Sequence, residues 1–325
     1  MANIIQKLSY IKENFPAYIK RYIYPFPKFK KEFIVMIDGT QSHGGLTDRF
    51  RNILSVYLFC KNNKLKFRLY YIYPCNLKYY LLPHRYNWTI ESKNISYSIY
   101  DTRDLYIYTN AHTLTQDSSK WAIINNQEHI STLNKAAQNK KPIQYHIYGN
   151  AYFGKGNYKE LFNELFTPSP YLIKQLSVIK ENINQEYEAI TLRFQQLLGD
   201  FKEGNFEILS NSKQELLIDK CKNKIIELYS NGFFNTKMIL VTSDSTRFLQ
   251  VIEKLSFVYT IPGKMEHMDY TQNFDIDVNA KSFIDLYLLS EAKCITLLQT
   301  EKMYKSGFPK FAAELGGKPY KEIIF

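Results

Sequence analysis

The sequence has few of the features that mark metal-binding, disulfide-bonded or membrane proteins. Only four of its 325 residues are cysteines, and no two form a C-x-x-C pair. This spacing argues against a zinc site or a thioredoxin-like centre and predicts buried free thiols in a reducing cytoplasm. No apolar run approaches the roughly 20 residues of a transmembrane helix, and no signal-peptide core is present. We therefore expect a cytoplasmic protein.

Signatures of two other ligand-binding classes are also missing. No G-x-G-x-x-G motif follows a strand-like segment, which argues against a dinucleotide-binding oxidoreductase. The net charge of +11 and the aromatic fraction of 16% suit an anionic partner, although a lysine-rich genome also raises the charge. Because the basic residues are dispersed, we expect no nucleic acid partner. A basic nucleic-acid-binding α/β protein remains an alternative.

Lysine, arginine and aromatic residues are interleaved over residues 1–31. Such a segment fits a peripheral contact with the inner face of an anionic membrane. It also fits a surface helix packed on its own domain, which is the interpretation that we favour. Pro25 and Pro27 end the segment in either case.

The hydrophobic pattern predicts an α/β protein with two domains. In the first half we expect strands at 32–37, 66–73, 104–109 and 143–148, a helix at 46–60, and loops with short helices over 110–142. In the second half we expect strands at 187–194, 237–242 and 294–298, with helices at 171–183, 214–229, 246–255, 282–291 and 307–315. This alternation predicts a parallel sheet covered on both faces. A loop-like stretch and a Pro-Ser-Pro cluster place the boundary between domains 1–165 and 166–325.

The first predicted strand leads through a polar turn to Gly44 and Gly45 and then to a helix that carries Arg49 and Arg51. Glycine lets the backbone approach a ligand, and a helix start offers unpaired N–H groups. The stretch therefore fits a phosphate-binding crevice. Strand–glycine–helix units are common in α/β proteins, so this motif alone is weak.

Polar residues also follow the predicted strands of the second half, where ligands of parallel sheets bind. Arg193 follows the first of these strands and can pair with a diphosphate through two forked hydrogen bonds. Ser243, Asp244, Ser245 and Thr246 follow the next strand, and Ser306 and Gly307 follow the last. Each serine or aspartate also suits a helix N-cap. Taken together, these strand ends predict a nucleotide ligand.

Four segments resemble the GDP-fucose-dependent fucosyltransferases of the GT-B class, in particular bacterial α1,2- and α1,6-fucosyltransferases and nodulation fucosyltransferases. Gly44-Gly-Leu-Thr-Asp-Arg-Phe-Arg51 resembles the N-terminal Gly-Gly-Leu-x-x-Arg-hydrophobic-Arg motif of that family, and Ala189-Ile-Thr-Leu-Arg193 stands where the family has a strand ending in His-x-Arg. The stretch Leu240-Val-Thr-Ser-Asp-Ser-Thr-Arg-Phe-Leu249 resembles the Ser/Thr-Asp strand-end motif of that family. The stretch 288–315 resembles its last α/β unit, in which a serine-containing turn leads into a helix. The histidine of His-x-Arg is Thr191 here, so a role for that histidine does not transfer.

The resemblance implies two Rossmann-like domains that face a central cleft. It also implies an inverting, metal-independent transfer of fucose from GDP-fucose to a glycan hydroxyl. On this view Arg193 stabilises the departing diphosphate, with Arg49, Gly44 and Gly45 approaching from the N-terminal, acceptor-side domain. The expected donor-binding set comprises Gly44, Gly45, Arg193, Ser243, Asp244, Ser245, Thr246, His267, Ser306 and Gly307. No cofactor or metal is expected.

The general base is less certain. We rank Asp200 above Asp38 and Asp38 above Glu203, although each fits a solvated loop carboxylate equally well. His267 lies in a polar loop and is expected to contact the nucleotide, for instance its guanine.

Three further questions stay open. A donor with a different sugar is one alternative, and the departure at Thr191 leaves a degenerate transferase without turnover as another. The acceptor is expected to be a surface glycan intermediate, for example a lipid-linked oligosaccharide for polysaccharide or lipopolysaccharide synthesis. The rings of residues 70–88 fit core packing better than stacking on this acceptor.

Overall fold

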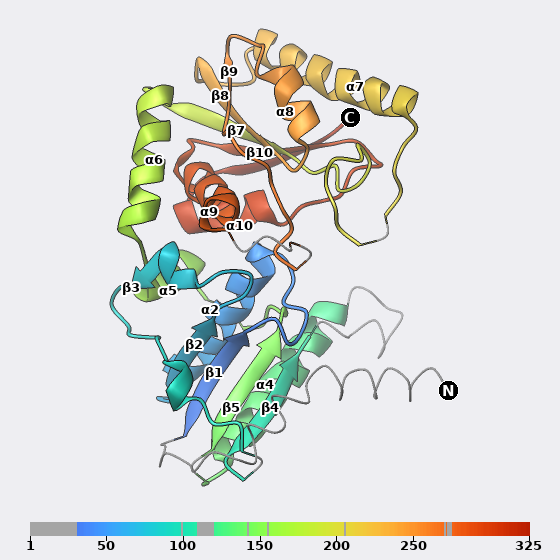
Figure 1. Ribbon diagram of the computed structural model, residues 1–325. Helices are drawn as coiled ribbons and strands as arrows, with labels where there is room; N and C mark the ends of the chain where they lie inside the picture. Colours follow the sequence, from blue (N-terminus) through green and yellow to red (C-terminus); the bar gives the residue numbers. More distant parts are fainter. Residues whose placement is uncertain are drawn as a thin grey trace. The chain divides into compact units, whose positions relative to one another are not determined.

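The computed structural model describes residues 31–98, 100–108, 120–141, 143–154, 156–204, 206–269, 271 and 275–325. The described residues form two compact α/β units (Figure 1). The described residues of the first unit lie within 31–44, 48–73 and 83–157, and those of the second lie within 45–47, 74–82 and 158–325. The predicted boundary at 165/166 falls within the second unit. The basic segment for which we weighed a membrane contact lies outside the described residues, apart from Lys31.

The first unit is built on a four-stranded parallel sheet in the order β2-β1-β5-β4. Its strands are β1 (Glu32–Ile37), β2 (Lys66–Tyr71), β4 (Thr102–Ile107) and β5 (Gln144–Gly149). Every residue of β1 and β5 is buried, as expected for central strands of a parallel sheet. The helix α2 (Leu46–Asn62) contributes Phe59, which packs on Phe33 of β1.

The stretch 110–142, where we predicted loops and short helices, contains the 18-residue helix α4 (Trp121–Gln138). That prediction was wrong. The buried stripe of α4 is Asn125, His129, Leu133 and Ala136, which repeats with helical spacing. Because two of these four residues are polar, a pattern of apolar residues does not reveal the helix.

The second unit is built on a five-stranded parallel sheet in the order β11-β10-β7-β8-β9. Its strands are β7 (Tyr187–Leu192), β8 (Met238–Ser243), β9 (Val258–Thr260), β10 (Ile295–Gln299) and β11 (Tyr320–Ile324). We did not predict β9, which has three residues, or β11, which is half-exposed at the sheet edge. A short ribbon joins β3 (Leu81–Pro83) to β6 (Phe166–Pro168).

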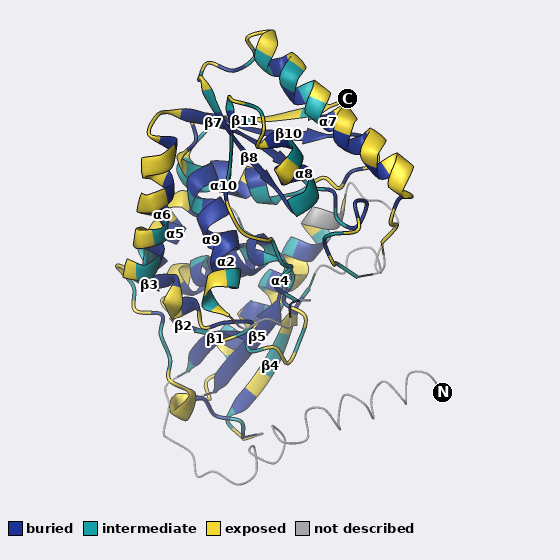
Figure 2. Cartoon of the chain, turned by 45° about the horizontal axis from the view of Figure 1, so that its top comes forward, coloured by how far each residue is buried: buried dark blue, intermediate teal, exposed yellow. Residues whose placement is uncertain are grey.

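Helices cover both faces of this sheet, as predicted. The helices α7 (Asn211–Ser230) and α8 (Thr246–Ile252) lie on one face, where they share a core with Ile190, Val241 and Leu298. The helices α9 (Ile276–Glu291) and α10 (Phe308–Gly316) lie on the other face (Figure 1). The unit also contains α5 (Tyr158–Leu165) and α6 (Pro170–Ile183). Figure 2 shows the central strands β7, β8 and β10 and the helix α9 as largely buried.

Local sequence explains where these elements begin and end. The Ser169 side chain accepts a hydrogen bond from the Leu172 amide and caps α6, and Pro170 occupies its first position. The helix ends at Asn184 in a left-handed conformation with φ of 44°. All four cysteines are free and buried, which confirms that prediction. In the described part of the chain no helix is both long and apolar enough to cross a bilayer.

Candidate active site

The carboxyl ends of β7 and β8 place Arg193 and Asp244 together. The two strands are neighbours in the sheet, and Leu192 pairs in register with Ser243. The next residue of each strand is therefore delivered to the same edge, as the strand-end rule predicts. The Arg193 Nε atom lies 3.3 Å from Asp244 Oδ2.

Asp244 is buried, with 4% of its surface exposed, and its carboxylate supports the turn that follows β7. Its Oδ1 accepts a hydrogen bond of 2.9 Å from the Phe194 amide, and its Oδ2 accepts one of 2.7 Å from the Gln195 amide. Gln195 has a φ of 53°, so the chain turns sharply here, and the Asp244 carboxylate satisfies the N–H groups of the turn. Burial raises the pKa of Asp244 to about 6, while Arg193 and the two amides limit the rise.

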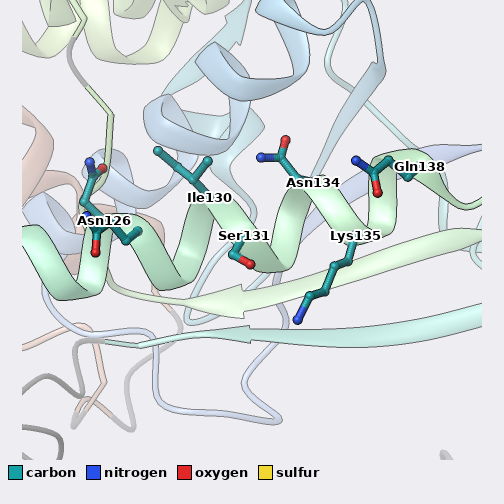
Figure 3. Close-up of a pocket in the computed structure, with 7 residues that line it drawn as sticks. Asn126, Ile130, Ser131, Asn134, Lys135 and Gln138 are labelled. Atoms are coloured by element: carbon teal, nitrogen blue, oxygen red, sulfur yellow. The ribbon is translucent and has the colours of Figure 1, made fainter.

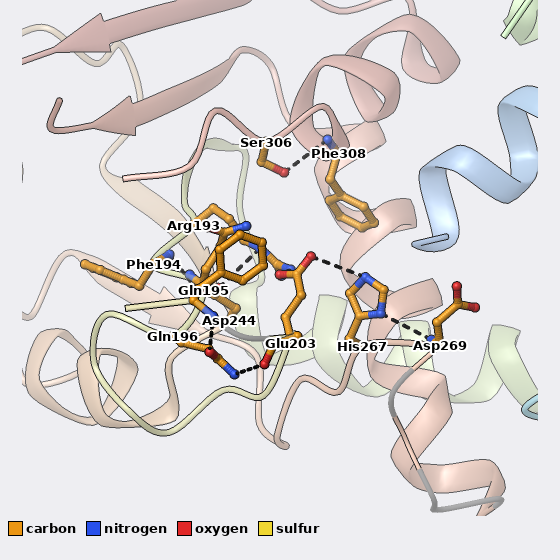
Figure 4. Close-up of polar contacts among 12 residues, drawn as sticks. Arg193, Phe194, Gln195, Gln196, Glu203, Asp244, His267, Asp269, Ser306 and Phe308 are labelled. Atoms are coloured by element: carbon orange, nitrogen blue, oxygen red, sulfur yellow. Dashed lines mark hydrogen bonds and ion pairs between the residues drawn. The ribbon is translucent and has the colours of Figure 1, made fainter. Parts of the chain in front are cut away.

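Arg193 contacts both Asp244 and Glu203 (Figure 4). Its Nη2 atom donates to Glu203 Oε2, and its guanidinium carbon lies 4.4 Å from the centre of the Phe201 ring. The Arg193 side chain remains 18% exposed and that of Glu203 16% exposed. Arg193 is therefore held by two carboxylates and an aromatic face, yet can still be reached from solvent.

His267 lies on the other side of Glu203, with its Nε2 atom 3.5 Å from Glu203 Oε1. Its Nδ1 atom accepts a hydrogen bond of 3.2 Å from the Asp269 amide. The loop that carries Glu203 is held by Gln196, which donates to the Gly204 carbonyl and accepts from the Phe206 amide. Arg193, Glu203 and His267 thus form a row of charged and polar groups (Figure 4).

Asp200, our first choice for a general base, serves α8 instead. Its Oδ2 atom accepts hydrogen bonds of 2.9 Å from the Ser245 hydroxyl and from the Arg247 amide. Ser245 is itself the N-cap of α8, because its hydroxyl oxygen accepts from the Phe248 amide. Asp200 therefore stabilises the start of a helix, and its Oδ2 atom is already engaged.

The remaining predicted donor residues lie where β8 leads into α8 and where the chain leads from β10 into α10. The Ser243 hydroxyl oxygen accepts from the Ser245 amide, and Thr246 is the first residue of α8. Ser306 accepts from the Phe308 amide, and Gly307 occupies the N-cap position of α10 without contributing a side chain. The turn after β10 contacts the arginine strand, because the Tyr304 amide donates to the Arg193 carbonyl. These short polar residues organise the loops that surround Arg193.

Thr191, which replaces the histidine of the related motif, pairs with Thr242 of the neighbouring strand. Its hydroxyl lies 2.9 Å from that of Thr242 on β8, and both residues are buried. This position therefore supplies no imidazole beside Arg193.

The predicted residues of the N-terminal half belong to another strand end, at the end of β1. Asp38 Oδ1 accepts from both the amide and the hydroxyl of Thr40. Gly44 has a φ of 72°, and a Cβ atom at this position would lie only 3.1 Å from Asp48 Cβ, so a side chain there would be strained. Gly45 follows and is half-buried.

Arg49 has no exposed surface. It donates to the Gly44 carbonyl over 3.0 Å, to the Tyr73 carbonyl over 2.6 Å and to the Tyr71 hydroxyl over 3.1 Å. These bonds fix the glycine turn from inside the first unit. A guanidinium group that binds a diphosphate must be accessible to it, and Arg49 is not.

A hollow of about 470 Å³ lies along α4 (Figure 3). It is lined by the helix face that runs from Asn126 to Gln138, and its polar groups are amides, one hydroxyl and the Lys135 ammonium group. None of the predicted site residues lines it. Across the described residues, no group of three or more His, Cys, Asp or Glu side chains is placed to hold a metal ion.

The pairing of Glu203 with both Arg193 and His267 was not anticipated. Glu203 was our last choice for the base, and His267 was expected at the nucleotide. Both side chains come from loops, where neither periodicity nor strand-end position predicts contacts. The only available signal was the closeness of Glu203 to Arg193 in the chain.

Comparison with known proteins gives a structural likeness only. No family model and no curated protein sequence matches the chain. The α-1,6-fucosyltransferase NodZ soaked with GDP-fucose is similar, with a TM-score of 0.56 and 11% identity over 88% of this chain and 93% of NodZ. Selenomethionine-labelled NodZ from Bradyrhizobium gives a TM-score of 0.53 at 11% identity, over 88% of this chain and 92% of that protein. A point mutant of Arabidopsis thaliana FUT1 in complex with GDP gives 0.52 at 12% identity, over 99% of this chain and 78% of FUT1. The chain therefore has the α/β fold of these fucosyltransferase structures.

Proposed function

We propose that this protein transfers fucose from GDP-fucose to a hydroxyl group of a glycan. The order of the four motifs supports this proposal, as does the fold shared with structures whose ligands are GDP-fucose and GDP. One observation carries it. Arg193 stands at the carboxyl end of β7, fixed by the buried Asp244 and still partly exposed.

In the proposed reaction Arg193 binds the donor diphosphate. Asp244 orients the guanidinium through Nε, and the diphosphate competes with Glu203 for Nη2. As the bond between fucose C1 and the phosphate oxygen breaks, negative charge grows on that oxygen. A guanidinium that is already oriented stabilises this charge without reorganisation.

Glu203 is the general base that the geometry favours, ahead of Asp200 and Asp38. Asp200 holds α8, and Asp38 accepts both hydrogen bonds from Thr40. Binding of a diphosphate to Arg193 releases the Glu203 carboxylate. Glu203 then takes the proton of the acceptor hydroxyl, whose oxygen attacks C1 from the face opposite the diphosphate. The electron pair of the broken C1–O bond leaves with GDP, and C1 is inverted.

The finer features of the proposal follow from the same site and from the resemblance. Arg193 supplies positive charge that a divalent cation would otherwise provide, so we propose a metal-independent reaction. We propose a lipid-linked surface glycan intermediate as acceptor, at the cytoplasmic face of the membrane, with an α1,2 or α1,6 linkage. The net charge of +11 suits such an anionic surface.

A thermal-shift series with GDP, UDP, CMP and NAD tests the donor. A ligand present at 100 times its Kd stabilises the native state by about 2.7 kcal/mol. We expect GDP to raise the unfolding midpoint and GDP-fucose to be hydrolysed slowly to GDP and fucose. Stabilisation by UDP or CMP instead would indicate another nucleotide sugar, and no stabilisation by any of them would refute the proposal.

A further inference from the structure

The His267 ring is held in a braced turn. The Thr271 amide donates to the His267 carbonyl over 2.9 Å, and the Thr271 hydroxyl donates to the Glu266 carboxylate. The next side chain, Met268, is buried in the core. Backbone, side-chain and core contacts therefore fix the position of this imidazole before any ligand binds.

The hydrogen bond from the Asp269 amide determines which ring nitrogen carries the proton. An N–H group donates to His267 Nδ1, so Nδ1 is an acceptor in the neutral ring. The proton then resides on Nε2, which is the atom that faces Glu203 Oε1 at 3.5 Å. In this tautomer the Nε2–H group of His267 is directed at the Glu203 carboxylate.

Glu203 needs such a partner when a donor is bound. Its carboxylate contacts Arg193 through Oε2, the contact for which a diphosphate competes. Its loop is tied to the preceding turn by the two hydrogen bonds of Gln196. When Arg193 turns to the diphosphate, the Glu203 side chain loses this contact and gains rotamer freedom.

We infer that His267 is a positioning residue for Glu203. It donates Nε2–H to Oε1 and keeps the carboxylate in place while Arg193 holds the donor diphosphate. This inference rests on the proposed function, in which Glu203 removes the acceptor proton. It places His267 at the base rather than at the guanine, where we expected it from the sequence.

Substitutions at His267 test this role through the steady-state kinetics of GDP-fucose hydrolysis, in which water is the acceptor. In His267→Ala we expect kcat to fall about tenfold, the loss from one hydrogen bond to a charged group, with the KM for GDP-fucose within about twofold. His267→Gln keeps an N–H donor, so we expect it to recover most of the lost kcat. His84→Ala is the matched control, because His84 is exposed and belongs to the first unit.

The outcomes separate the two proposals. Wild-type protein that neither binds GDP nor turns over GDP-fucose overturns the proposed function and this inference with it. Active wild type with an unchanged kcat in His267→Ala, or with a loss only in KM, overturns the inference alone. Equal loss of kcat in His267→Ala and His267→Gln also overturns it, because a retained donor should rescue the rate.

Discussion

Each unit has one arginine that the sequence suggested as a phosphate ligand, Arg49 in the first turns of α2 and Arg193 just after β7, and the two differ in what surrounds them. Arg49 is fully buried and donates to two carbonyl groups and a phenol of its own unit. Arg193 is partly exposed and pairs with two carboxylates, one of them on a loop. From the sequence we expected both arginines to bind phosphate. The contacts assign Arg49 to the stability of a turn and leave Arg193 able to exchange one anionic partner for another.

The largest effect is expected at Arg193. Arg193→Ala should lower kcat/KM for GDP-fucose by about 100- to 1000-fold, the range for loss of one preorganised donor at a developing charge. The fold should persist, because Asp244 keeps two backbone N–H donors. Arg193→Lys should recover little, since an ammonium group lacks the planar fork. Activity assays measure the loss of kcat/KM, and circular dichroism measures whether the fold persists. Near-normal turnover in Arg193→Ala would contradict the role of Arg193 in catalysis.

Arg49→Ala should act on stability instead. It leaves two carbonyls and a hydroxyl of the turn without their donor, which costs about 2–4 kcal/mol. The thermal midpoint should fall by several degrees, while the folded protein should bind GDP as wild type does. Arg85→Ala, which removes an exposed arginine, is the control and should change neither quantity. A stable Arg49→Ala protein that has lost GDP binding would restore the phosphate role.

The comparison also shows what a sequence reveals. Strands such as β1 and β7 were predictable because every residue is buried. That Arg193 and Asp244 lie close together was predictable, because each directly follows a strand of the same parallel sheet. The helix α4 was missed because its buried face contains Asn125 and His129. The contact of Glu203 with His267 depends on two loops, each shaped by its own hydrogen bonds, so no local pattern encodes it.

Asp244 gives the Arg193 site a pH dependence. Its pKa is raised to about 6 in the folded protein, so it becomes protonated as the pH falls below 6 and then releases the Arg193 Nε contact. We expect affinity for GDP-fucose to weaken by up to about tenfold per pH unit below 6, measured by calorimetry. GDP-fucose suits this test because its diphosphate keeps its charge in this range. Asp244→Asn should bind more weakly at pH 7 with a flatter profile, and an unchanged slope would assign the effect to another group.

The same carboxyl affects folding with the opposite sign. The ordinary pKa of an aspartate is about 3.9, so the folded state binds the extra proton between pH 4 and 6. The contribution of Asp244 to the free energy of unfolding is therefore largest below pH 4 and is lost as the pH rises through 6. Ligand affinity and fold stability should consequently diverge with pH at this site.

The smallest effect is expected in the first unit, at His129 of α4. Its ring is 3% exposed, its Nε2 atom has no hydrogen-bond partner among the described residues, and burial lowers its pKa. Below about pH 6.5 the unfolded chain binds a proton that the folded chain does not, so stability falls as the pH drops, by at most about 1.4 kcal/mol per unit. Denaturant unfolding of wild type and His129→Gln at pH 5.5 and 7.5 measures this. The wild type should lose more stability than the variant, and equal losses would show that His129 does not titrate. We expect His129→Gln to leave GDP affinity at pH 7.5 unaltered, whereas Asp244→Asn should lower it.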